Sequence, residues 1–78
     1  MSDTTKLSAS DRQAFTDAYR FWERHHDMPN TVEAWDGGSD EIKEIISRYE
    51  DPELVGNLLS ALFLTIDRRM RRELKGKA

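Results

Sequence analysis

The chain has 78 residues, of which 35% are charged and 37% hydrophobic, and its formal net charge is −3. This length accommodates one domain, and the absence of cysteine excludes disulfides, thiolate metal sites and thiol nucleophiles. The longest nearly apolar run, residues 58–66, is too short to span a bilayer, and the polar residues 1–10 do not have the pattern of a signal peptide. We therefore expect a cytoplasmic protein with no membrane contact.

The first predicted helix covers residues 10–27 and follows a polar tail, residues 1–9, that we expect to be disordered. Ser10 is the expected N-cap, with Gln13 as its capping-box partner. The apolar face comprises Phe15, Ala18, Tyr19 and Trp22, widened by Ala14, Phe21 and His25. Most aromatic residues of the chain are expected in the core, and Phe21 and Phe63 are expected at its edge. The helix must end before Pro29, because proline disfavours helical geometry in the preceding residue.

The second predicted helix covers residues 31–49, with Asn30 or Thr31 as its N-cap and Asn30 and Glu33 as a capping-box-like pair. Gly37 and Gly38 leave two alternatives, a break with a new helix capped by Ser39, or one continuous helix. The phase favours the continuous helix. At about 100° per residue, one face carries Trp35, Ile42, Ile45, Ile46 and Tyr49.

The third predicted helix covers residues 52–75, with Asp51 as N-cap, Pro52 at the first helical position and Gly76 as the stop. Its leucine-rich apolar arc is wider than one neighbouring helix can cover, so we expect it to contact both other helices. The short connections make consecutive helices antiparallel. The sequence thus predicts an all-α, up-down-up three-helix bundle, with one domain over residues 10–75 and a frayed C-terminus at 76–78.

Charge is distributed unevenly, at −8 over residues 1–67 and +5 over residues 68–78. The basic patch comprises Arg68, Arg69, Arg71 and Arg72. It could bind nucleic acid, or it could complement the dipole of the third helix and pair with carboxylates of the other two. We favour the second interpretation, because nucleic-acid readers usually carry a basic domain and no stacking aromatic residue lies among these arginines. A further alternative is an inhibitor encoded by a phage or mobile element, docking an acidic face on a nucleic-acid-binding enzyme. That face comprises Glu33, Asp36, Asp40 and Glu44.

The sequence contains few features typical of a catalytic or metal-binding site. Glu23 and His26 have the spacing of carboxylate di-iron bundles, but a second such motif is missing. No serine lies in a nucleophile motif, and Gly37-Gly38 lacks the lysine and spacing of a phosphate loop. We expect no enzyme activity, no bound metal and no cofactor.

One surface of the third helix is a candidate protein interface. Leu64 points away from the main apolar arc, and Gly56 and Ser60, four residues apart, would allow another helix to approach closely, with Phe63 beside them. The alternative is a solitary exposed leucine, which is common. Small bundles also gain stability by self-association. We therefore expect a non-enzymatic interaction module that binds a partner protein or forms a homodimer.

The chain also resembles a group of known sequences. Its segments "AYRFWERHHDMPNT", "RYEDP" and "LLSALFLTIDRRMR", with Trp35 between the first two, resemble small uncharacterised all-helical proteins of Gram-positive gut bacteria and their phages and mobile elements. The resemblance covers residues 12–72, and Gly37-Gly38 departs from it. It implies an all-helical fold and a mobile-element setting, with no catalytic residue.

Overall fold

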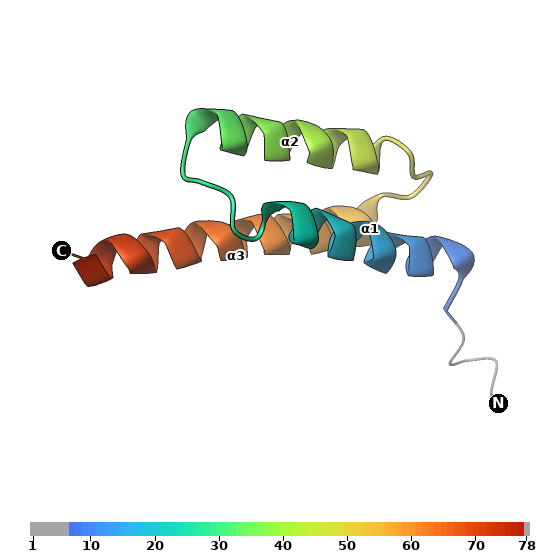
Figure 1. Ribbon diagram of the computed structural model, residues 1–78. Coiled ribbons are helices and arrows are strands. Elements are labelled where there is room, and N and C mark those ends of the chain that lie inside the picture. Colours follow the sequence, from blue (N-terminus) through green and yellow to red (C-terminus); the bar gives the residue numbers. More distant parts are fainter. Residues whose placement is uncertain (1–6, 78) are drawn as a thin grey trace.

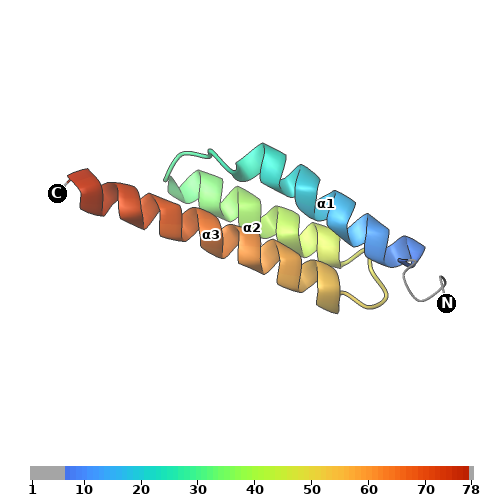
Figure 2. The same cartoon turned by 90° about the horizontal axis from the view of Figure 1, so that it is seen from below.

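The computed structural model describes residues 7–77, which form three α-helices joined by short loops (Figure 1). The helices are α1 (Ala9–His25), α2 (Val32–Ile46) and α3 (Glu53–Lys77). α1 and α3 run parallel, α2 runs antiparallel to them, and α3 packs against both other helices (Figure 2). The predicted all-α, up-down-up bundle is confirmed. Of the two segments expected to be disordered or frayed, residues 1–6 and 78 lie outside the described residues.

The start of α1 differs from the prediction. Ser8 is the N-cap in place of Ser10, and its Oγ accepts a hydrogen bond from the backbone N–H of Asp11 at 3.0 Å. Gln13 donates to Asp17 at 2.9 Å instead of reaching back to a cap. The Asp11 carboxylate lies in the first turn with either cap, and there it complements the positive end of the helix dipole. The capping box predicted for Ser10 and Gln13 was therefore wrong.

The start of α2 uses one of the two predicted caps. Thr31 accepts a hydrogen bond from the N–H of Ala34 at 3.1 Å, while the side chain of Asn30 accepts one from Nε1 of Trp35 at 2.9 Å. The two neighbouring polar residues thus have different roles. Thr31 satisfies the first turn of the helix, and Asn30 holds the indole that packs against α3.

α2 continues through Gly37 and Gly38, as the phase of its apolar residues predicted. Gly38 is buried against α3, and a Cβ atom added there would lie 2.8 Å from Cε1 of Phe63. The missing side chain therefore allows the Phe63 ring to pack against the backbone of α2. The helix ends at Ile46, so Tyr49 lies beyond it and not on its last turn.

The buried core was predicted only in part. Its members are Ala14, Ala18, Phe21, Ile45, Val55 and Leu59, and Met28 and Ile66 are buried as well. Phe21, expected at the edge, is fully buried. Phe15 and Tyr19, expected in the core, are 50% and 63% exposed. Ala14 and Ala18 lie four residues apart on one side of α1, and their small side chains allow α1 to pack closely on α3, which moves the bulkier aromatic residues outward.

α3 is the longest element and extends past the other two helices (Figure 2). The side chain of Asp51 accepts a hydrogen bond from the N–H of Glu53 at 3.2 Å, and Pro52 precedes the first helical residue. Gly76, the predicted stop, lies inside the helix, which continues to Lys77. The chain is consequently elongated, with principal extents of 54 × 26 × 17 Å.

Candidate functional site

An apolar groove lies between α1 and α3, and none of its lining residues comes from α2. It is lined by Phe15, Ala18, Tyr19, Trp22, Leu58 and Leu62, and it has a volume of about 310 Å³. Ala18 is buried at its floor, while Phe15 and Tyr19 expose half or more of their surface at its rim. We call these six residues the α1/α3 groove. Among its large apolar side chains, Phe15 and Tyr19 are exposed and the others are half-buried.

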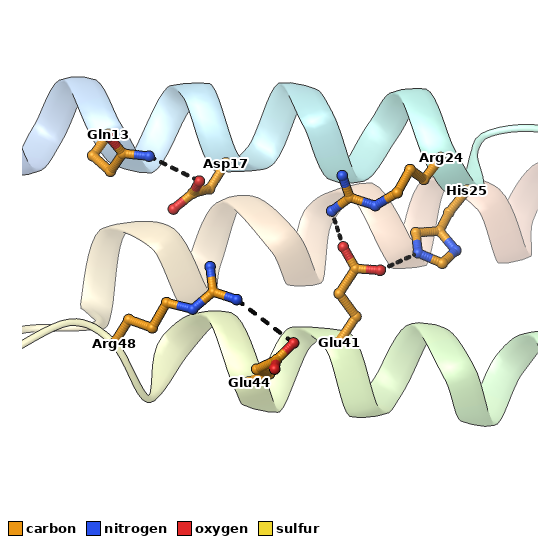
Figure 3. Close-up of polar contacts among 7 residues, drawn as sticks. All are labelled: Gln13, Asp17, Arg24, His25, Glu41, Glu44 and Arg48. Atoms are coloured by element: carbon orange, nitrogen blue, oxygen red, sulfur yellow. Dashed lines mark hydrogen bonds and ion pairs between the residues drawn. The ribbon is translucent and has the colours of Figure 1, made fainter.

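Polar contacts to α2 hold α1, which forms one wall of the groove, in place (Figure 3). Glu41 of α2 accepts hydrogen bonds from two consecutive residues of α1, Arg24 and His25, with 2.8 Å between His25 Nε2 and Glu41 Oε1. Burial lowers the pKa of His25, and the charge of Arg24 lowers it further. A His25 ring with its proton on Nε2 donates to the Glu41 carboxylate, whose charge Arg24 also compensates.

A second polar contact ties α1 to the chain beyond α2. The hydroxyl of Tyr49 donates a hydrogen bond to the Asp17 carboxylate. The pKa of Tyr49 is raised to about 12, first by burial and then by the hydrogen bond to Asp17 and the negative charge of Asp17. No local spacing signals this pair, because the two residues lie 32 positions apart in the sequence. Both polar contacts support the fold on the side opposite the groove.

The residues with metal-like spacing are separated in the structure. His25 is turned toward Glu41, whereas the ring of His26 lies 5.8 Å from the ring of Trp22, and Glu23 is exposed. Across residues 7–77, no cluster of three or more potential ligand residues has the arrangement needed to hold a metal ion.

The four residues of the predicted interface on α3 do not share one exposed surface. Leu64 is 48% exposed and Ser60 is exposed. Phe63, however, packs against Gly38 and Trp35 of α2, and the space beside Gly56 is limited by Ile46. Two of the four thus belong to the packing of α2 on α3. The solvent-facing remainder consists of Ser60 and Leu64.

The four arginines of the basic patch are all exposed, but they point in different directions around α3. The guanidinium of Arg69 lies over the Trp22 ring, 5.1 Å from its centre, and Nε of Arg71 lies 3.0 Å from Oδ2 of Asp67. Arg68 and Arg72, four residues apart, share one side of the helix. The arginines therefore do not form a continuous strip.

The acidic face predicted on α2 is present as a solvated surface. Glu33, Asp36, Asp40 and Glu44 are all exposed, and their spacing places them on one side of the helix. Glu44 lies 3.6 Å from Arg48, which partly compensates its charge (Figure 3).

No protein-family model, curated protein or solved structure matches the chain, so the resemblance to proteins of gut bacteria and their mobile elements stays an expectation. Among the described helices, none carries an apolar stretch long enough to cross a bilayer.

The α1/α3 groove is the site that sequence reasoning missed. The aromatic residues that form its rim were assigned to the core, because their helical spacing is that of a buried face. A signal was nevertheless present. Ala14 and Ala18 occupy the same broad apolar arc as Phe15 and Tyr19, and small residues four apart mark the line of closest helix approach.

Proposed function

We propose that this chain is a non-enzymatic protein–protein interaction module that binds an α-helix with an apolar stripe in its α1/α3 groove. The observation that supports this proposal is the exposure of Phe15 and Tyr19 beside Leu58 and Leu62. A fully buried aromatic side chain removes roughly 200 Å² from water, so covering the exposed parts of these two would bury about 200 Å². At about 25 cal/mol per Å², this contributes about 5 kcal/mol before the costs of association are subtracted.

The shape and chemistry of the groove favour a helix as the occupant. Its walls are two parallel helices, and its lining consists of aromatic and aliphatic side chains. A helix lying between them would place its own side chains into the spaces between successive turns, as helices do in bundles. Such helix-in-groove binding relies on apolar anchors at intervals of three and four residues. A highly charged ligand has little to bind here.

Binding of nucleic acid by the basic patch has less support. Arg69 lies over Trp22 and Arg71 contacts Asp67, which leaves Arg68 and Arg72 as the pair sharing one free side of the helix. This alternative predicts DNA or RNA binding that weakens steeply with salt and is lost when all four arginines are replaced by glutamine. An absence of binding by the parent protein at low salt would exclude it. The inhibitor alternative has no observation in its favour beyond the solvated acidic face of α2.

The proposed function can be tested by placing a photo-crosslinking amino acid in the groove. Substituting Tyr19 by p-benzoylphenylalanine puts the reactive group at the exposed rim, and the same substitution at Asp36, on the outer side of α2, provides a matched control. We expect a crosslinked protein species in host cells from position 19 and not from position 36. The Leu58→Asp change, which introduces a charge into the groove, should remove that species.

The product must also be mapped by mass spectrometry to an apolar helical segment of the crosslinked protein. Crosslinks that are equal from both positions, or that persist with Leu58→Asp while circular dichroism shows an intact fold, would contradict the proposal. A complete lack of crosslinks from position 19 would contradict it as well.

A further inference from the structure

We infer that α3 of a second copy of this chain packs along α3 at the edge of the α1/α3 groove, where it covers Leu58, and runs antiparallel to α3 across a two-fold axis near Ala61. This inference rests on the proposed function and names its partner. It follows from the spacing of the outward-facing residues of α3, from their size and from the charges at their two ends.

The outward side of α3 carries a heptad-like series that continues the rim of the groove. We call it the outer stripe, and it comprises Leu54, Leu58, Ala61, Thr65, Arg68 and Arg72. Successive members are separated alternately by four and three residues, which is the spacing of residues along the contact line of paired helices. Ala61, Arg68 and Arg72 are exposed, and the other three are half-buried. Leu54 and Leu58 pack partly against the buried core of the chain, and their exposed parts continue the stripe.

The middle of the outer stripe suits a close approach of two helices. Ala61 has a small exposed side chain, which would allow the backbones to come together at the axis. The hydroxyl of Thr65 donates to the backbone oxygen of Ala61 at 2.7 Å, so its hydrogen-bonding need is met within the helix and it can present its methyl group outward. Leu58 lies beside both residues and also lines the groove.

Antiparallel pairing makes the outer stripe complementary to itself. If Ala61 faces its counterpart, Leu58 faces Thr65 of the second copy, and Leu54 faces Arg68, whose aliphatic stem can cover it. One turn further, Asp51 faces Arg72. Each contact occurs twice, as a two-fold interface requires.

The charges at the ends of α3 favour antiparallel over parallel pairing. Glu50 and Asp51 are exposed where the helix begins, and Arg68 and Arg72 are exposed in its second half. A parallel pair would place acidic end against acidic end and basic against basic. The antiparallel pair instead places each acidic end against a basic one. Arg12 and Arg48 also lie toward this end of the bundle, but Asp11, Glu50, Asp51 and Glu53 outnumber them.

A charge exchange tests this arrangement on the purified full-length chain by analytical ultracentrifugation. Asp51→Arg and Arg72→Asp each place like charges opposite one another in the antiparallel dimer. Two ion pairs become two repulsive contacts, so we expect each variant to raise the dissociation constant of the dimer about tenfold. The double variant restores opposite charges, and its dissociation constant should return to near that of the parent.

Mixing the two single variants separates pairing from folding. Asp51 accepts a hydrogen bond from the N–H of Glu53, so its replacement also weakens the start of α3. In a mixed dimer of Asp51→Arg with Arg72→Asp, both inter-copy contacts join opposite charges. We therefore expect the mixture to dimerise at concentrations where either variant alone is monomeric. A general folding defect cannot produce this recovery.

A cysteine at the proposed axis gives an independent test, because the chain has no native cysteine. Under mild oxidation, Ala61→Cys should form a disulfide-linked dimer rapidly, whereas Asp36→Cys on the outer side of α2 should not. A parent chain that remains monomeric at high micromolar concentration would overturn the inference. So would a mixture that fails to recover dimerisation, or equal crosslinking from positions 36 and 61. A monomeric chain that still crosslinks to a different protein from position 19 would contradict the second copy alone and leave the proposed function intact.

Discussion

Adding one methyl group to each of two adjacent glycines in α2 should have opposite effects on stability. At Gly37, a Cβ atom would have no neighbour within 4 Å, and at Gly38 it would lie 2.8 Å from Cε1 and 3.0 Å from Cζ of Phe63. Both substitutions remove the same backbone freedom from the unfolded chain, which by itself stabilises a helix by about 0.4–1 kcal/mol. Gly37→Ala should therefore increase the free energy of unfolding by about that amount.

Gly38→Ala receives the same entropic gain, but it must also displace the Phe63 ring. That ring has little room to move, since its centre lies 4.8 Å from the Trp35 ring and 6.0 Å from the Phe21 ring. Forcing extra atoms into a packed interior typically costs about 1–3 kcal/mol. The two variants should consequently differ by about 1–3 kcal/mol, with Gly38→Ala the less stable of the two.

The measurement is urea or thermal unfolding followed by circular dichroism. For a domain of this size, about 1 kcal/mol shifts the melting temperature by roughly 4–8 °C, so the difference is readily measured. A Phe63→Leu background provides a further check, because Gly38→Ala should be better tolerated once the ring is gone. If Gly38→Ala stabilised the parent as much as Gly37→Ala does, the close approach of α2 to α3 at this point would be refuted.

Three further predictions concern titration and surface substitution. Spectrophotometric titration should show Tyr49 ionising near pH 12, and Asp17→Asn should lower that midpoint toward 10. A midpoint that Asp17→Asn leaves unchanged would contradict the hydrogen bond between Tyr49 and Asp17. The pKa of His25 is lowered by burial and by Arg24, so the unfolded chain binds more protons than the folded chain. The free energy of unfolding should therefore fall as the pH drops below 6.5. In His25→Gln, the free energy of unfolding should no longer show this pH dependence. Leu64→Asp should leave both folding and dimerisation unchanged, and a weaker dimer in sedimentation would return the interface to that side of α3.

The fold could be predicted from the sequence because its signals are local. Pro29 and Asp51-Pro52 separate three segments whose apolar residues recur at helical spacing, and the phase across Gly37 and Gly38 indicates a single helix. The cap of α1 was assigned to the wrong serine. Ser8 and Ser10 are chemically equivalent candidates, and nothing nearby in the sequence indicates which of them precedes the first helical residue.

The site could not be predicted, because it depends on which part of a broad apolar arc faces inward. α1 carries apolar side chains over so wide an arc that two adjacent faces are both plausible. Total apolar area favours the face with Phe15, Tyr19 and Trp22. The closeness of α1 to α3 favours the face with Ala14 and Ala18, and this tertiary constraint prevails. Likewise, the fit of Gly38 against Phe63 joins residues 25 positions apart, so it is not visible in either segment alone.

The close packing and the exposed groove have one cause, which links stability to interaction. Ala18 belongs to the buried core and also forms the floor of the α1/α3 groove. Its small side chain brings α1 near α3, and the same approach leaves Phe15 and Tyr19 no room inside. A larger residue at this position would both fill the groove and push α1 and α3 apart. The chain therefore cannot enlarge its core along this line without giving up the surface that we propose binds a further helix, which is the kind of conflict expected where a binding surface limits stability.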